Sequence, residues 1–186
     1  MTTAEVDGPN GIEPDTKDWT WVLERPCDEC GFNASSISHY DVAGAIRRDA
    51  ADWVRRLSGP SVRERSNPAV WSVLEYGCHV RDVHRMFDGR VRLMLAEDEP
   101  LFPNWDQDAT AVDDDYASQH AAVVTEGLVQ AAHRVADTYA SVSADQWSRP
   151  GLRSNGSRFT VSTIAVYHLH DVVHHGWDVD SPRIGR

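Results

Sequence analysis

The stretch YHLHDVVHH (residues 167–175) holds four of the nine histidines in the sequence, and its other residues are mainly apolar. The surrounding segment, from Thr160 to about Val179, has apolar residues at three- and four-residue steps and therefore predicts a helix. On a helix, His170 and His174 project from one face about a turn apart. Two imidazoles at this spacing can bind one metal ion. The stretch therefore predicts a helix that carries part of a metal site.

Three earlier segments also predict helices. Apolar residues recur at helical spacing over residues 41–57, 69–95 and 116–141. Gly59 and Pro60 end the first segment, and the run Ser66-Asn67-Pro68 supplies a capping residue and a proline for the start of the second. The connection over residues 96–115 has no clear period, and we expect it to lie over another part of the protein. Four helices with connections of varied length predict an all-α four-helix bundle.

A metal site in this bundle needs a third ligand from another helix. Catalytic zinc sites take three protein ligands and leave one position for water or substrate. The second predicted helix offers His79 near its inward face, whereas His84 lies five residues further on and is turned away. We therefore predict that His79 is the third ligand. Glu75, one turn before it, is predicted to act as a catalytic proton acceptor, as a support for a ligand or as a fourth ligand. The alternative is that these histidines are surface residues or hydrogen-bonded core residues.

Two motifs resemble those of a known family. The stretch WSVLEYGCH (residues 71–79) is similar to a second-helix motif of Trp-Ser, a glutamate and a histidine four residues later. The stretch HDVVHH (residues 170–175) is similar to a His-x-x-x-His motif in a last helix. In this order and separation, the two resemble the DinB/YfiT-like superfamily of metal-binding four-helix bundles, over roughly residues 38–179. The resemblance implies that His79, His170 and His174 bind zinc, with nickel, manganese or iron as alternatives.

The resemblance also implies an activity. Characterised members include transferases that join a low-molecular-weight thiol to an electrophile, using bacillithiol or, in actinobacteria, mycothiol, and a mycothiol-dependent maleylpyruvate isomerase. Isomerase-type members often have glutamate where His170 stands, so this chain looks closer to the all-histidine S-transferase branch. A thiol with a pKa near 8.5 is mostly protonated at neutral pH, and a metal cation favours its nucleophilic thiolate. We therefore expect a metal-dependent S-transferase that uses mycothiol, in detoxification or secondary metabolism.

The thiol's sugar needs polar partners, and Arg81, Asp106 and Asp171 are the predicted binding residues, with no basis for choosing among them. We expect the electrophile to lie under residues 97–115. Two alternatives stay open: a thiol-dependent isomerase or metal-assisted hydrolase, and a non-enzymatic protein that binds a metal or small ligand. Bundles of this kind often dimerise along their helices, so a homodimer is a further expectation.

Residues 1–38 are predicted to form an irregular extension, with the bundle spanning residues 39–186, because glycines and prolines interrupt the extension and no period is sustained. Its aromatic residues, among them Trp19 and Phe32, indicate that its later half docks on the bundle. Cys27-Asp28-Glu29-Cys30-Gly31 resembles one knuckle of a zinc ribbon, but a ribbon needs a second pair. A structural metal and a redox pair are possible there, and a buried turn is the favoured interpretation.

The composition excludes several classes of function. The net charge is −11, and basic residues are not clustered, which argues against nucleic acid and anionic membranes as partners. No apolar run approaches the roughly 20 residues that span a bilayer, and the first residues do not resemble a secretion signal, so a cytoplasmic location is expected. Three cysteines do not suggest a disulfide framework, and Cys78 is expected to be a small buried residue.

Overall fold

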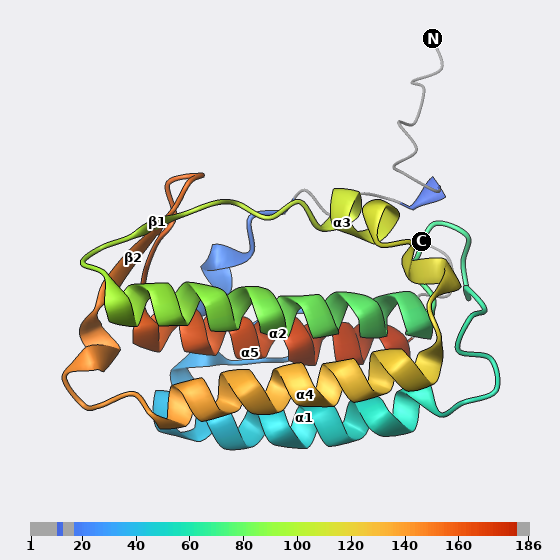
Figure 1. Cartoon of the computed structure of the whole chain (residues 1–186), viewed down its shortest axis with the longest axis horizontal. Coiled ribbons are helices and arrows are strands. Elements are labelled where there is room, and N and C mark those ends of the chain that lie inside the picture. The colour runs from blue at the N-terminus through green and yellow to red at the C-terminus, as the bar shows by residue number, and fades with distance from the viewer. Residues whose placement is uncertain (1–10, 13–16, 182–186) are drawn as a thin grey trace, which may run out of the picture.

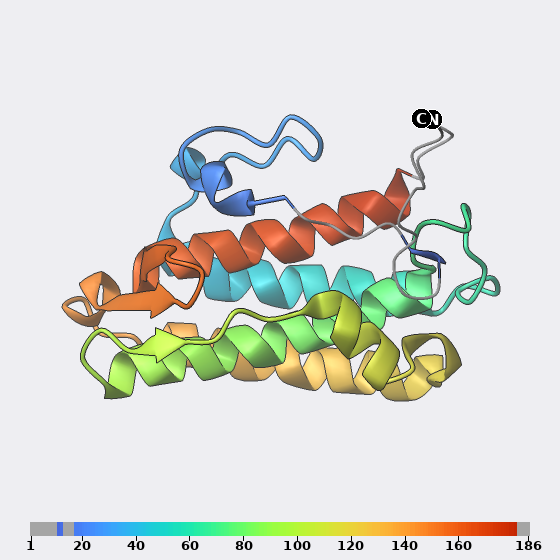
Figure 2. The same ribbon diagram turned by 90° about the horizontal axis from the view of Figure 1, so that it is seen from above.

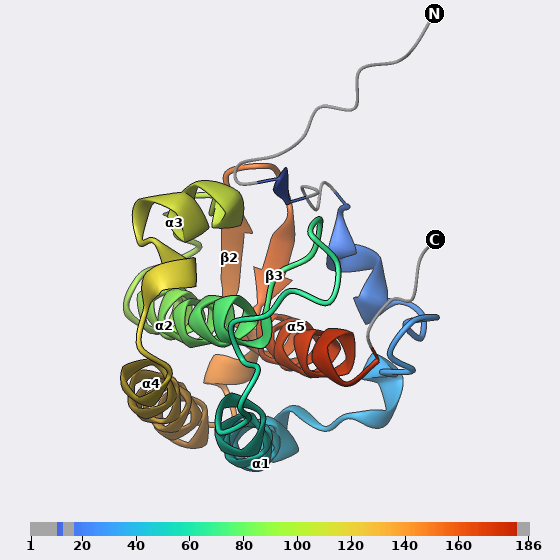
Figure 3. The ribbon, with the colours of Figure 1, turned by 90° about the vertical axis from the view of Figure 1, so that its right-hand side faces the viewer.

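Four long helices form the body of the protein: α1 (Val42–Leu57), α2 (Val73–Ala96), α4 (Ala121–Ala140) and α5 (Val161–Asp180). The computed structural model describes residues 11–12 and 17–181. Helices α4 and α5 each pack against both α1 and α2, so the four helices occupy the corners of a bundle (Figure 3). The predicted four-helix bundle is confirmed in this respect. No helix within the described ranges is long and apolar enough to cross a membrane.

Helices α2 and α4 run in the same direction, because the connection between them returns along the whole bundle (Figure 1). This connection carries a short strand, β1 (Leu101–Phe102), and a short helix, α3 (Gln107–Asp113). The side chain of Asp106 caps α3 by accepting a hydrogen bond of 2.9 Å from the Ala109 N–H. The segment that lacked a sequence period therefore has local structure and lies over the bundle.

The prediction of an all-α fold was wrong in one respect, because the structure contains a small sheet. Strand β1 pairs in parallel with β2 (Pro150–Arg153), which pairs in antiparallel fashion with β3 (Arg158–Thr160). Leu101 lies opposite Leu152, and Gly151 lies opposite Phe159. Strands of two to four residues are too short to show a period of two in the sequence. The sheet joins the α2–α4 connection to the start of α5.

The long helices begin where side chains cap them. Helix α2 starts at Val73, four residues later than the Ser66-Asn67-Pro68 run predicted, because Ser72 and Glu75 form a reciprocal capping box. Helix α5 starts at Val161 with a similar arrangement of Thr160 and Thr163. These caps fix where the histidines of both helices lie along the bundle.

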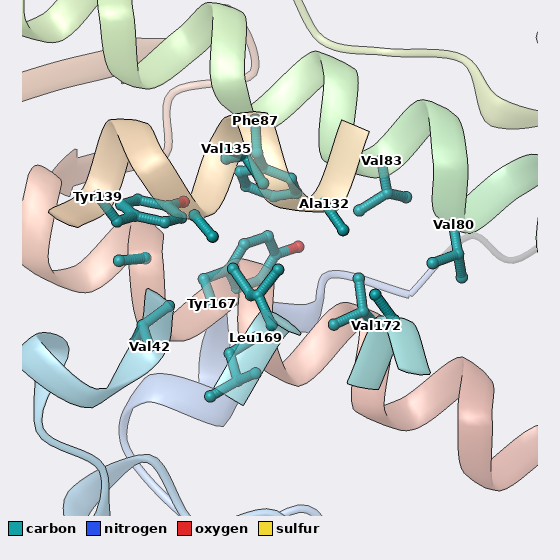
Figure 4. Close-up of a cluster of buried hydrophobic side chains, with 14 of the residues drawn as sticks. Val42, Val80, Val83, Phe87, Ala132, Val135, Tyr139, Tyr167, Leu169 and Val172 are labelled. Atoms are coloured by element: carbon teal, nitrogen blue, oxygen red, sulfur yellow. The ribbon is translucent and has the colours of Figure 1, made fainter. Parts of the chain in front are cut away.

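The core lies between the four helices, where residues such as Val83, Phe87, Val135 and Val172 meet (Figure 4). Each such side chain contributes about 1.5–3 kcal/mol when it is fully removed from water. The core therefore sets which face of α5 is turned toward α2 and which face is turned away from it.

The N-terminal segment docks beside α5 (Figure 2), as its aromatic residues predicted. Between residues 17 and 41 the structure describes the short 3-10 helices η2 (Trp19–Leu23), η3 (Ala34–Ser36) and η4 (His39–Asp41). Val22, Cys27 and Phe32 are buried and join the bundle core. The segment and the bundle share one core, and the expected division at residue 38 stays a prediction.

Candidate metal centre

Helices α2 and α5 bring His79, Asp171 and His175 together. The Nε2 atoms of His79 and His175 lie 3.0 Å apart, and the Asp171 Oδ1 atom lies 3.4 Å from His175 Nε2 and 4.0 Å from His79 Nε2. One ligand atom from each of the three lies within 4.8 Å of the others. We call these residues the α2–α5 cluster. Their number and closeness suit a single metal ion.

Aromatic and acidic residues surround this cluster. Trp105, from the α2–α4 connection, stacks on the His79 ring with centroids 5.3 Å apart, and Trp71 lies 5.0 Å from the same ring. The Asp178 Oδ2 atom lies 3.2 Å from His175 Nδ1. A carboxylate in this position holds the imidazole so that its other nitrogen faces the cluster. The connection expected to cover the site therefore does cover His79.

Charges in the cluster are strongly coupled. Burial and then the charge of His175 lower the pKa of His79 to about 3, so this imidazole is neutral. Burial opposes protonation of His175, but the Asp171 and Asp178 carboxylates outweigh it and raise the pKa of His175 to about 10. His175 can then donate one hydrogen bond to His79 and another to Asp178. A divalent cation would replace the proton between the two imidazoles and face the same carboxylates.

The structure divides the three predicted ligands between two places. His170 and His174 lie with Cys27 and Cys30, and ligand atoms of these four lie within 4.8 Å of one another. We call this set the Cys–His cluster. Neighbouring residues of a helix diverge by about 100°, so positions 170 and 174 cannot face the same way as positions 171 and 175. Within the described residues, His79 is grouped with the latter pair.

Glu75, predicted to be catalytic, is bonded to Arg65 and to the start of α2. Its carboxylate forms an ion pair with Arg65, with one Nε–Oε2 contact of 3.0 Å, and accepts a hydrogen bond of 2.8 Å from the Ser72 N–H. Burial raises its pKa, but the bonds to Arg65 and Ser72 outweigh this and lower the pKa below the usual value. The carboxylate therefore fixes the start of α2.

The three residues predicted to bind the thiol lie in three different settings. Arg81 is buried and donates hydrogen bonds to Asp82 and to Gln119, which hold it on another side of α2 from His79. Asp106 is exposed at the start of α3. Asp171 belongs to the α2–α5 cluster, where it is placed to act as a metal ligand. The structure thus does not bring the three together.

Sequence reasoning did not select His175 as a candidate ligand, although a signal was present. The stretch HDVVHH contains two pairs at four-residue spacing, residues 170 with 174 and residues 171 with 175. Only the first pair is His-x-x-x-His, and the second is Asp-x-x-x-His, which also suits a metal.

Other titratable residues of α2 and α5 form part of the core. The fully buried His84 and His168 lie with Nδ1 and Nε2 3.0 Å apart, and His168 Nδ1 lies 3.1 Å from the Tyr139 hydroxyl. Cys78 is fully buried, as expected, and burial raises the pKa of its thiol to about 12. None of these groups is presented to a ligand as a nucleophile or metal-binding atom.

A hollow of about 180 Å³ lies beside the α2–α5 cluster. Its wall includes Trp71, Tyr76 and Asp178, which contact the rings of His79 or His175. The rest of the wall combines valines with acidic and hydroxyl groups: Glu64, Ser66, Val70, Val73 and Val179. The arrangement places a mixed apolar and acidic surface next to the imidazoles, which suits a small molecule without negative charge.

Comparison with known proteins gives two matches. The model of the DinB superfamily matches residues 44–179, which is well over half of the chain. A solved structure of YfiT from Bacillus subtilis, described as "a probable metal-dependent hydrolase with an unusual four-helix bundle topology", superposes with a TM-score of 0.62 at 16% sequence identity. The match covers 75% of this chain and 83% of the YfiT chain. No curated protein matches the sequence.

Proposed function

The chain belongs to the DinB superfamily, and we propose on that premise that it is a metal-dependent enzyme whose cation is held by His79, Asp171 and His175. The observation that carries this proposal is the convergence of two imidazoles and one carboxylate from α2 and α5 within 4.8 Å. Three protein ligands are the usual number in catalytic zinc sites, which keep one position open.

The donor atoms fit a divalent cation. The Asp171 Oδ1 atom is buried and forms no hydrogen bond of normal geometry within the described residues, so it is available to a cation. His79 is neutral because of its burial, as a metal ligand must be. The Asp178 carboxylate contacts the Nδ1 atom of His175 and so orients the Nε2 atom of the same ring toward the cluster. Imidazole and carboxylate ligands suit zinc, iron, nickel and manganese.

We propose that the enzyme is a thiol S-transferase, with mycothiol as the thiol. When bound, the cation supplies a Lewis acid that favours the thiolate form of a thiol at neutral pH. The hollow beside His175 is the surface on which we propose that part of the thiol lies. Glu64 and Asp178 on its wall disfavour thiols with negative charge, and an uncharged sugar thiol such as mycothiol is compatible with them.

The carboxylate ligand supports a second group of reactions. The preference for S-transfer rested on a histidine at position 170, and Asp171 now supplies the carboxylate that isomerase-type members carry. Two histidines and a carboxylate also hold the zinc of several hydrolases, and the YfiT neighbour is described as a probable hydrolase. We therefore propose a thiol-dependent isomerase or a metal-assisted hydrolase as the second candidate, with water activated in the hydrolase.

One experiment separates these functions. Zinc-loaded protein is incubated with mycothiol and monochlorobimane, and in parallel with ester and amide substrates without thiol. Conjugate formation above the rate without protein supports S-transfer, provided that it is lost in His175→Ala and kept in the exposed control His133→Ala. Hydrolysis without thiol would support the hydrolase and overturn S-transfer. No turnover in either assay, with zinc bound, would contradict both the S-transferase and the hydrolase.

A further inference from the structure

The Cys–His cluster lies outside the proposed catalytic site, on a different face of α5. We propose that Cys27, Cys30, His170 and His174 form a second metal site, a structural zinc centre that fastens the N-terminal segment to the bundle. The cluster joins two parts of the chain that are far apart, since 147 positions separate Cys27 from His174.

Distances within the cluster match a tetrahedral zinc ion. One ligand atom from each of the four residues lies within 4.8 Å of the others, and the Cys27 Sγ atom lies 3.7 Å from His174 Nδ1. With Zn–S near 2.3 Å and Zn–N near 2.0–2.1 Å, sulfur and nitrogen ligands on a tetrahedral ion stand about 3.6 Å apart. The donors are therefore spaced as they would be around an ion.

The backbone between the cysteines turns both sulfurs toward α5. The Gly31 N–H donates to the Cys27 carbonyl at 2.9 Å, the Cys27 N–H donates to the Phe32 carbonyl at 2.8 Å, and Gly31 has a φ of +74°. This is the arrangement expected of a Cys-x-x-Cys metal knuckle, completed here by histidines instead of a second cysteine pair.

Each of the two histidines has a ring nitrogen that is available to a metal ion. The His170 Nε2 atom is buried and has no hydrogen-bond partner among the described residues. The other ring nitrogen of His174, Nε2, lies 3.8 Å from a Glu29 oxygen and 3.9 Å from an Asp178 oxygen, so Nδ1 is left facing Cys27. A carboxylate behind a metal-binding imidazole is a common supporting arrangement.

The cluster is largely closed, as a structural site is and a catalytic one is not. Cys27, His170 and His174 are buried, Cys30 is half-buried, and Trp19 covers both imidazoles with ring centroids at 5.6 and 4.7 Å. Phe32 packs its edge against His170 at 5.3 Å. Four protein ligands leave no position for a substrate. Two thiolates also favour zinc over magnesium, calcium and manganese.

A disulfide between Cys27 and Cys30 is the competing interpretation of this cluster. A disulfide would use the two sulfurs and leave the partnerless His170 Nε2 atom without a role. The zinc centre uses all four donors, and it explains why the extension docks on this face of α5.

Asp178 lies between the two clusters, with its Oδ2 atom 3.2 Å from His175 Nδ1 and 3.9 Å from His174 Nε2.

The test uses the full chain purified after growth with zinc. Zinc K-edge absorption should show about two sulfur ligands near 2.3 Å for this site, and elemental analysis should show that the double variant Cys27→Ser, Cys30→Ser loses one zinc per chain. The matched control Cys78→Ser, which removes a buried thiol outside the cluster, should keep that zinc. His79→Ala should also keep the sulfur-bound zinc, so failure of the proposed catalytic site is distinguishable.

Two results would overturn the proposal: zinc-loaded protein without sulfur ligands, or a Cys27–Cys30 disulfide in protein whose zinc content the double variant does not change. If the double variant fails to fold, the proposal is tested by the absorption spectrum of the parent protein in which cobalt replaces zinc. A thiolate-to-cobalt charge-transfer band supports the site, and its absence in cobalt-loaded protein contradicts it.

Discussion

The Nε2 atoms of His79 and His175 lie 3.0 Å apart, although 96 residues separate the two histidines in the sequence. Asp171 completes this group, and Asp178 holds His175 from its other side. The pair joins α2 to α5 behind Trp71, Tyr76 and Asp178, which line the neighbouring hollow.

Replacement of His175 by alanine is expected to weaken metal binding at the α2–α5 cluster on the order of 100-fold, because one of three ligands is lost. Mn²⁺ is a suitable probe, since thiolates do not select it, and binding is measured by calorimetric titration. His170→Ala is the matched control and should change Mn²⁺ affinity by less than about threefold. Weakened binding in His170→Ala with unchanged affinity in His175→Ala would show that the ion is held by His79, His170 and His174, as the sequence first predicted.

Asp178→Asn is expected to lower the affinity of the α2–α5 cluster about 10- to 100-fold, because Asp178 orients His175 through Nδ1. Asparagine keeps the size of the side chain and removes its charge. The same Mn²⁺ titration measures the effect, with the exposed Asp137→Asn as control. Unchanged affinity in the variant would show that His175 is held by its other contacts.

Helical periodicity in the sequence was sufficient to predict the four long helices, but not the direction in which α5 presents its histidines. The pairs 170 with 174 and 171 with 175 differ by one position, which is a rotation of about 100°. Core contacts of residues such as Leu169 and Val172 fix that rotation, and these contacts depend on the other helices. The sequence therefore indicated a metal-binding helix and left open which residues face α2.

The Cys–His cluster shows a second limit of sequence reasoning. Cys27 and Cys30 were compared with motifs whose second pair lies nearby, and the pair that meets them is at the far end of the chain. The short strands could not be predicted for a related reason. Strand β1 pairs with β2, which lies about 50 residues further along the chain, and strands of three or four residues such as β2 and β3 show no period in the sequence. Long-range partners decide both features.

Glu75→Gln is expected to cost about 1–3 kcal/mol of stability at pH 7, because the buried Glu75 loses its charge next to Arg65. The pKa of Glu75 is lowered in the folded state, so its contribution is present above the unfolded pKa and is lost as the pH falls below it. Urea denaturation at pH 7 and pH 4 should show a difference from the parent that shrinks at pH 4. A variant with parental stability and lost turnover would instead restore Glu75 as a catalytic residue.

Asp49→Asn is expected to stabilise the protein at pH 8 by about 1–3 kcal/mol. Asp49 lies on α1 with a buried oxygen that has no hydrogen-bond partner among the described residues, and burial raises its pKa to about 7. The folded chain holds the Asp49 proton more tightly than the unfolded chain. The stabilisation that this proton gives the folded state is therefore full below about pH 4 and is lost as the pH rises through 7. Urea denaturation at pH 5 and pH 8 measures the difference in the free energy of unfolding between variant and parent. The histidines titrate alike in both proteins, so their contributions cancel in this difference. The difference should grow with pH, whereas the exposed control Asp41→Asn should show none; a difference that is the same at both pH values would contradict the raised pKa.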